Sequence, residues 1–179
     1  LGAAAKKASV EEVVSETSNG GTRQGKLVFE LPEDATAFDQ VKALYETALV
    51  SLEDTEKALP IFNGVVHECL RLEQIKDSDE EPKDLHPEDN DVDSYLQVKK
   101  DSEKIFGAEF YFIFGDSLRN IAELSMGDVD GDAFDQVKGL FLAARDRFQV
   151  ASSLQDPIEQ LSEASIRVES FLAILEEFK

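Results

Sequence analysis

The spacing of apolar residues after residue 34 constrains the fold most strongly. Apolar side chains recur there at intervals of three and four residues, which places them along one face of an α-helix. Residues 105–114 are different, because they are apolar nearly all round and a helix at the protein surface would show a polar face. The pattern therefore predicts an all-α fold in which the helix through 105–114 is central.

Three helices are expected in the first part of this pattern. The first follows Asp34, where the helical spacing begins. The second should start near Pro60, because proline is tolerated in the first turn, where its missing N–H has no partner to lose. The third covers about residues 92–125, with a bend expected near Gly107 or Gly115.

Two more helices complete the expected fold. One follows the turn at residues 127–132, and the last has Asp156 as its N-cap, Pro157 in its first turn and Glu159 near its positive end. The residues expected on the buried faces are Phe38, Val41, Leu44, Tyr45, Ala48, Leu49, Leu52, Ile61, Phe62, Val65, Val66, Cys69, Leu72, Ile75, Phe134, Val137, Leu140, Phe141, Ala144, Phe148, Ala151, Ile158, Leu161, Ser165, Val168, Phe171, Leu172, Leu175 and Phe178.

A short internal repeat suggests how these helices are arranged. Residues 37–42 and 133–138 share the sequence Ala-Phe-Asp-Gln-Val-Lys, and each copy is followed one residue later by leucine and an aromatic residue. The two helices would then be equivalent first helices of stacked antiparallel hairpins, as in tetratricopeptide-like arrays. A plain helix bundle is the alternative, because the full spacing of that repeat is absent.

The sequence before the helices differs in composition. Residues 1–26 are rich in small and polar residues and predict a flexible N-terminal arm, which leaves an all-helical domain at 27–179. Residues 27–31 have strand-like composition but no candidate partner strand, so we expect an extended apolar piece docked on the core. Residues 77–93 contain nine acidic residues and one basic residue, and they predict a solvated acidic loop.

Charge and cysteine content exclude several classes of protein. The chain has 38 acidic and 18 basic residues, a net charge of −20, so it cannot bind nucleic acid by neutralising phosphates. A single cysteine, Cys69, excludes an internal disulfide and a cysteine-rich metal site, and it favours a reducing compartment.

No apolar run in the sequence is long enough for a membrane span, and residues 1–16 lack the apolar centre of a signal peptide. Because the chain starts at Leu1 and its only methionine is Met126, we expect it to be part of a longer protein.

No catalytic, cofactor or metal site is predicted. His67 and Cys69 are two residues apart on one helix, so they point in nearly opposite directions and cannot act as a pair. We expect a packed Cys69 thiol and a partly buried, hydrogen-bonded His67. Residues 128–132 resemble a calcium loop, but counted from Asp128 the position that needs glycine is Ala133 and the position that needs a bidentate glutamate is Gly139. Binding of basic proteins is the function that the charge favours, and the alternative is that the charge only keeps the chain soluble.

The second helix carries a family signature. Residues 62–72 read Phe-Asn-Gly-Val-Val-His-Glu-Cys-Leu-Arg-Leu, which resembles Leu-Asn-Gly-Ile/Val-Ile/Val-His-Glu-Cys-Asp-Arg-Leu of the fungal enhancer of translation termination family. Residues 40–45 are similar to the family's Gln-Leu-Lys-Gly-Leu-Trp, and the resemblance covers the N-terminal part of the family. The residues that match the signature, with a structural or binding role, are Asn63, Gly64, His67, Glu68, Cys69 and Arg71.

The resemblance implies an all-helical, tetratricopeptide-like adaptor without catalysis or cofactor. Such a protein would regulate a prolyl-hydroxylating iron and 2-oxoglutarate dioxygenase and bind its basic small-subunit ribosomal protein. Importins are further expected partners, whereas direct contacts to nucleic acid or membrane are not. The role would connect nuclear import, hypoxic gene regulation and translation termination, with the protein in nucleus and cytoplasm. The basic ribosomal partner agrees with the net charge of −20.

Overall fold

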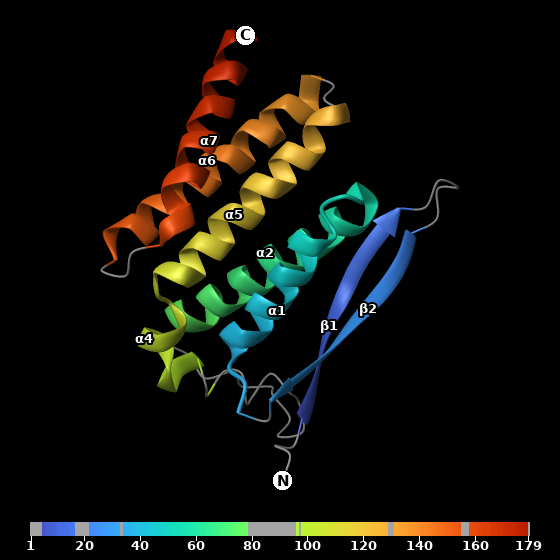
Figure 1. The fold of residues 1–179 in the computed structure, drawn as a ribbon, viewed down its shortest axis with the longest axis vertical. Helices are drawn as coiled ribbons and strands as arrows, with labels where there is room; N and C mark the ends of the chain where they lie inside the picture. The colour runs from blue at the N-terminus through green and yellow to red at the C-terminus, as the bar shows by residue number, and fades with distance from the viewer. Residues whose placement is uncertain are drawn as a thin grey trace.

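The fold is an array of antiparallel helices preceded by a β-hairpin (Figure 1). The computed structural model describes residues 5–16, 22–32, 34–78, 96, 98–128, 131–154 and 158–178. Its elements are β1 (Ala5–Glu16), β2 (Thr22–Pro32), α1 (Ala37–Val50), α2 (Thr55–Asp77), α4 (Ser102–Ile105), α5 (Ala108–Ser125), the 3₁₀ turn η1 (Met126–Asp128), α6 (Gly131–Ser153) and α7 (Glu159–Glu177). None of the described helices is long and apolar enough to cross a membrane.

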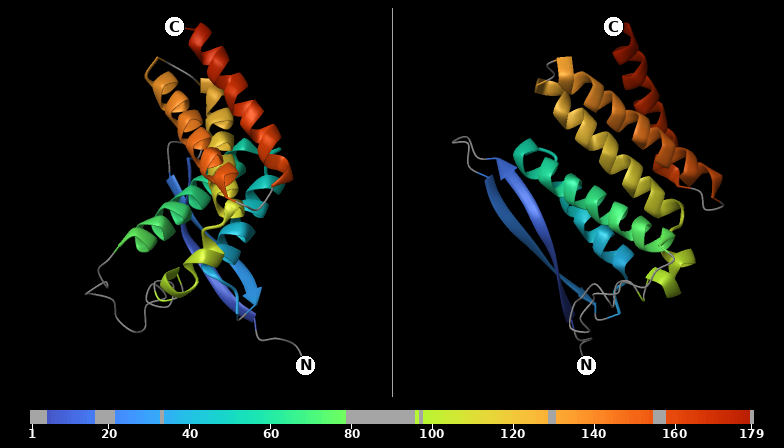
Figure 2. Two further views of the ribbon diagram at one scale, coloured as in Figure 1. Left: turned by 90° about the vertical axis from the view of Figure 1, so that its left-hand side faces the viewer. Right: turned by 180° about the vertical axis from the view of Figure 1, so that it is seen from behind.

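The long helices form two layers. Helix α2 packs on α1 and α5, and α6 packs on α5 and α7. Helices α1 and α7 also contact α5. In the side view of Figure 2, α2 and α6 lie on one side, and α1 and α7 lie on the other side with α5 next to them. Successive helices run in opposite directions, and the view from behind shows the layer of α2 and α6 (Figure 2). The all-α prediction is confirmed for the helical domain, and tetratricopeptide-type stacking stays a prediction.

Helix α5 is the centre of the array, as its apolar composition predicts. Nearly every residue from Ala108 to Ala122 is buried, including the large rings of Phe110 and Phe114. The Phe110 ring lies edge-on to Phe106, with 4.9 Å between ring centroids. Such edge contacts are favourable for aromatic rings beyond the area that they bury.

Helix α1 begins at a capping box. The Asp39 backbone N–H donates to Thr36 Oγ1 at 3.1 Å, and the Thr36 N–H donates to Asp39 Oδ2 at 2.8 Å. These two bonds satisfy N–H groups that the first turn leaves without helical partners. Leu49 and Leu52 were expected on the buried face, but they are 36% and 38% exposed. The prediction is wrong for Leu52 because α1 ends at Val50 and Leu52 lies in the turn that follows. It is wrong for Leu49 because this side chain lines an open groove beside α1.

Two other helix ends differ from the sequence prediction. Helix α2 starts at Thr55, so Pro60 is its sixth residue rather than part of its first turn. The turn that follows α1 is short, and the backbone of Lys57 and Ala58 already bonds to Asp54, which starts α2 early. Phe178 was expected on the buried face of α7 but is 76% exposed, because it follows the last residue of the helix.

The third expected helix is interrupted. Helix α4 ends at Ile105 and α5 starts at Ala108, so the chain breaks at residues 106–107, which agrees with the bend expected near Gly107. Gly115, the other candidate, lies inside an unbroken α5. Helix α7 starts at Glu159 with Ile158 at its N-cap, whereas Asp156 and Pro157 lie outside the described residues. The acidic loop predicted at 77–93 lies outside them from residue 79 onward.

A β-hairpin forms where an arm without regular structure was expected. Strands β1 and β2 pair antiparallel, from Ala5 opposite Pro32 to Glu16 opposite Thr22, with an irregularity between Val10 and Val13. The prediction that residues 27–31 lack a partner strand is therefore wrong. Helix α2 contacts β1, and β2 continues across the predicted boundary at residue 26. The division of the chain into arm and domain, and the flexibility of the arm, stay predictions.

The repeated sequence occupies equivalent places. Residues 37–42 open α1 and residues 133–138 lie in the first two turns of α6, and each helix is the first of an antiparallel pair. Val41 and Val137, at the same position of the repeat, are both buried. The repeated residues therefore place the same apolar face against the core twice.

Candidate protein-docking groove

A groove of about 830 Å³ lies on the layer of α1, α5 and α7. One face of α1 forms the first wall, the start of α7 forms the second, and α5 with the end of α4 forms the floor. Its lining residues are Phe38, Lys42, Tyr45, Glu46, Leu49, Lys104, Ile105, Gly107, Ala108, Glu109, Phe110, Phe112, Ile113, Asp116, Arg119, Ile158, Glu159, Gln160, Glu163, Ala164 and Arg167. Binding sites of about 300–1,000 Å³ are typical for small ligands.

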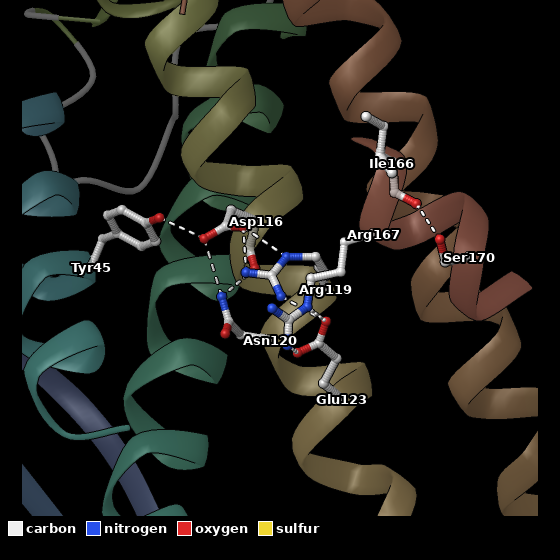
Figure 3. A network of polar contacts seen from close by, with 8 residues as sticks. All are labelled: Tyr45, Asp116, Arg119, Asn120, Glu123, Ile166, Arg167 and Ser170. Carbon is white, nitrogen blue, oxygen red and sulfur yellow. Dashed lines mark hydrogen bonds and ion pairs between the residues drawn. The ribbon is translucent and has the colours of Figure 1, made fainter. Parts of the chain in front are cut away.

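A buried carboxylate joins the first wall to the floor. The Tyr45 hydroxyl of α1 donates to Asp116 Oδ2 of α5 at 2.6 Å (Figure 3). The same carboxylate accepts from Asn120 Nδ2 at 3.1 Å and from Arg119 Nε at 2.8 Å. Asp116 is 4% exposed, and its three partners provide the hydrogen bonds that a buried charge requires.

A second carboxylate joins the floor to α7. Glu123 Oε1 accepts from Arg119 Nη1 at 2.7 Å and from Arg167 Nε at 2.6 Å, and Glu123 Oε2 accepts from Arg167 Nη2 at 3.0 Å. Asp116, Arg119, Glu123 and Arg167 thus form a chain of alternating charges from α5 to α7 (Figure 3). Two acids and two bases leave this network without net charge.

Burial shifts the pKa of two members of the network. Burial, reinforced by the charge of Asp116 and the hydrogen bond to it, raises the pKa of the Tyr45 hydroxyl far above its ordinary value. Burial of the Arg119 guanidinium acts to lower its pKa, but Asp116 and Glu123 outweigh that effect and raise it. Tyr45 therefore stays a neutral donor and Arg119 stays a cation.

The other charged side chains of the groove differ in whether they have a partner of opposite charge. Lys42 Nζ lies 3.2 Å from Glu109 Oε1, and Lys104 Nζ lies 3.8 Å from Asp101 Oδ1. Each of these lysines therefore has an acidic neighbour. Glu46 on the α1 wall, and Glu159 and Glu163 on the α7 wall, are exposed lining residues. Within the described part of the chain, no residue pairs with these three carboxylates. The lining therefore presents unpaired negative charge from two opposite walls.

Apolar side chains lie between these walls. Phe38 and Ile158 are partly buried, and Leu49 is 36% exposed, so all three offer apolar surface to the groove. Below them, Phe112 and Ile113 are almost fully buried in the floor. The groove thus combines an apolar centre with acidic sides.

The family-signature residues lie on α2, in the other layer, and none of them lines the groove. Gly64 is buried where α2 faces α1, and a Cβ added there would lie 3.4 Å from Leu44 Cδ2, an ordinary van der Waals contact. Arg71 Nη2 lies 3.0 Å from Glu68 Oε2, a pair within the helix. Asn63 is exposed. The structure therefore gives Gly64 a packing position and leaves Asn63 on the surface.

The two candidate reactive residues of α2 differ in burial. Cys69 is fully buried, and burial followed by the nearby charges of Glu73 and Glu68 raises the pKa of its thiol, which agrees with a packed, unreactive side chain. His67 is exposed, so the prediction of a partly buried histidine is wrong. Residues two positions apart lie on nearly opposite faces of a helix, so His67 lies on the face of α2 opposite the buried Val65 and Cys69. Among the residues that the structure describes, no three metal-binding side chains cluster together.

Sequence reasoning did not identify the residues of the network. Asp116 and Arg119 are charged residues inside a helix that is otherwise apolar and central, and they are three positions apart, the spacing of an ion pair on one helix face. Buried charges are rare unless they are paired. Two charged residues in an otherwise apolar central helix are therefore the sequence signal for this network. Tyr45, which pairs with Asp116, and Arg167, which pairs with Glu123, are distant in sequence from α5, and only the fold brings them to it.

The chain resembles known proteins along most of its length. Residues 1–169 match the family described as Nro1, nuclear pore complex subunit Nro1. A protein of Candida albicans strain WO-1 named enhancer of translation termination 1 is 27% identical over 142 residues, which cover 78% of this chain and 27% of that protein. Its counterpart in strain SC5314 is 29% identical over 127 residues, which cover 69% of this chain and 23% of that protein. The chain thus spans about a quarter of the length of these relatives, and no solved structure matches it.

Proposed function

This chain belongs to the Nro1 family, and on that premise we propose that it is a non-enzymatic adaptor that binds a basic protein partner. The groove carries this proposal: its cations have acidic neighbours, while Glu46, Glu159 and Glu163 do not pair within the described residues. Complementary charge speeds the encounter of two proteins and selects against wrong partners. The apolar centre of the groove adds shape and contact area.

The names of the family and of its relatives concern the process in which the adaptor would act. Relatives in Candida albicans are named for translation termination, and the family description names the nuclear pore complex. We propose that the partners are a prolyl-hydroxylating 2-oxoglutarate dioxygenase and its basic small-subunit ribosomal protein, with importins involved in transport. The adaptor would act in nucleus and cytoplasm and so affect hypoxic gene regulation and translation termination.

A generic acidic chaperone or import adaptor is the second candidate. The net charge of −20 favours it, because such a surface attracts any basic protein without a specific site. Attraction of that kind acts over the whole surface and is screened by salt, with a screening length of about 8 Å at physiological ionic strength. The two candidates therefore predict different responses to salt.

Binding measured at two salt concentrations distinguishes the candidates. The dioxygenase and the ribosomal protein, purified from a fungus that carries the family, are titrated into this chain by calorimetry at low and at physiological salt. A specific adaptor should keep binding both partners at physiological salt, with lysozyme as a basic control protein that does not bind. If lysozyme and the ribosomal protein bind alike and both are lost at physiological salt, the generic candidate is correct. Failure of both partners to bind at either salt concentration contradicts the adaptor proposal for this chain.

A further inference from the structure

The groove also indicates what kind of segment it binds, an inference that rests on the proposed function. Its volume of about 830 Å³ is that of a single small-ligand site, so it has room for a few side chains of a partner and not for the broad surface of a folded domain. A stable contact between two folded surfaces covers roughly 800 Å² on each partner, which is more than one groove between two helices offers. The occupant is therefore a local stretch of the partner.

The charges of the two walls define the polar part of that stretch. Glu46 lies on α1, and Glu159 and Glu163, four residues apart, lie on one face of α7 on the opposite wall. The two arginines of the groove are already paired. Arg119 forms ion pairs with Asp116 and Glu123, and Arg167 donates two hydrogen bonds to the Glu123 carboxylate. The groove lysines, Lys42 and Lys104, also have acidic neighbours, so the unpaired charges that an acidic segment would meet are carboxylates.

The apolar centre defines the rest of the stretch. Leu49 on α1 and Ile158 at the start of α7 expose apolar surface on the two sides, and Phe38 extends it toward the end of α4. An aliphatic side chain placed there would be flanked on both sides by the acidic walls. We propose that the groove binds a short Lys/Arg-rich segment of a partner protein with one aliphatic anchor, the basic side chains pairing with Glu46 on one wall and with Glu159 and Glu163 on the other.

A labelled peptide tests this proposal directly. The probe is a fluorescein-labelled peptide with one central leucine and Lys or Arg on each side, and its binding to the whole chain is followed by fluorescence anisotropy at physiological salt. Glu46→Gln combined with Glu163→Gln should weaken binding about tenfold, from two lost ion pairs. Glu56→Gln combined with Glu177→Gln is the matched control, because it removes the same charge from exposed residues outside the groove. The control should change affinity less than about twofold, because salt screens distant charges.

A second pair of variants tests the anchor. Leu49→Ala should weaken the peptide about threefold to tenfold, whereas Leu70→Ala, which truncates an equally exposed leucine of α2 outside the groove, should have no effect. A peptide with serine in place of the central leucine should bind as weakly to the wild-type chain as the leucine peptide binds to Leu49→Ala. Circular dichroism of each variant verifies that the helices are retained.

Several results would overturn the proposal. Equal weakening by both double glutamine variants would mean that the peptide responds to overall charge rather than to the groove. A dimer of the wild-type chain that Leu49→Ala abolishes would assign the groove to a second copy. If the ribosomal protein binds the wild-type chain and the Glu46/Glu163 variant equally well, the groove is not its site although the proposed function stands. If the ribosomal protein and the dioxygenase both fail to bind the wild-type chain, the proposed function itself fails.

Discussion

At the scale of single residues, the Tyr45 hydroxyl makes the contact that ties α1 to the buried network. Tyr45→Phe removes the donor to Asp116 and leaves that carboxylate with two side-chain partners, Arg119 and Asn120. Loss of a hydrogen bond to a charged group costs about 1.5–3 kcal/mol. We expect the free energy of unfolding in urea to fall by about that amount at neutral pH. An unchanged value would contradict a stabilising role for this bond.

The same residue gives stability a dependence on alkaline pH. The pKa of Tyr45 is raised in the folded state, so below its ordinary value of about 10 the hydroxyl is neutral in both states and contributes no pH dependence. Above that pH the unfolded chain loses the proton while the folded chain keeps it, and stability falls as pH rises. The difference in unfolding free energy between wild type and Tyr45→Phe should therefore shrink above about pH 10. A constant difference across that range would contradict the raised pKa.

His67 is the residue whose expected role changes most. Loss of a partly buried histidine would destabilise the protein, but His67 is exposed on α2. We expect His67→Ala to alter the free energy of unfolding by no more than about 0.5 kcal/mol. Cys69→Ala, a truncation of a fully buried side chain on the same helix, should cost clearly more. Urea unfolding of the two variants compares them directly.

At the scale of elements, α5 and α6 pack closely at Gly115. A Cβ there would lie 2.7 Å from two ring carbons of Phe148 and 3.1 Å from the Ala144 carbonyl oxygen. Gly115→Ala should therefore destabilise the domain by about 1–3 kcal/mol, although alanine favours the helix. Gly139→Ala in α6 is the matched control, because nothing lies within 4 Å of its added Cβ. The control should raise the free energy of unfolding by about 0.5–1 kcal/mol.

The start of α1 depends on its capping box. Thr36→Ala removes the side chain that accepts from the Asp39 N–H, and an N-cap substitution of this kind typically costs about 1 kcal/mol. Thr55→Ala, at the first residue of α2, is the control, since its exposed side chain is not the N-cap of that helix. Thermal unfolding should separate the two variants. Equal melting temperatures would show that the cap does not limit the stability of α1.

At the scale of the whole molecule, the net charge of −20 opposes the compact state. Added salt screens this repulsion, whereas the buried pair of Asp116 and Arg119 is screened much less. The melting temperature should therefore rise between low salt and about 0.3 M sodium chloride. Differential scanning calorimetry measures the change. A lower melting temperature in salt would mean that favourable surface ion pairs outweigh the repulsion.

The local pattern of residues predicts most of the helical segments and the apolar face of each helix. The spacing of apolar residues placed Val41, Phe62 and Phe141 correctly in the core, and the uniformly apolar composition identified the central helix. The family signature likewise identified the family. These properties are local, because a period of 3.6 residues is a property of one helix alone.

The contacts between elements follow from the packing of the whole chain. The pairing of β1 with β2, the exposure of Leu49 and His67, and the meeting of Tyr45 with Asp116 depend on which elements are neighbours. The apolar period of a helix shows that one face is buried but not against what it is buried. Tyr45 and Asp116 are 71 residues apart, so no local pattern could connect them. The groove exists only because α1 and α7 both pack against α5, and that arrangement brings carboxylates from two distant segments to one surface.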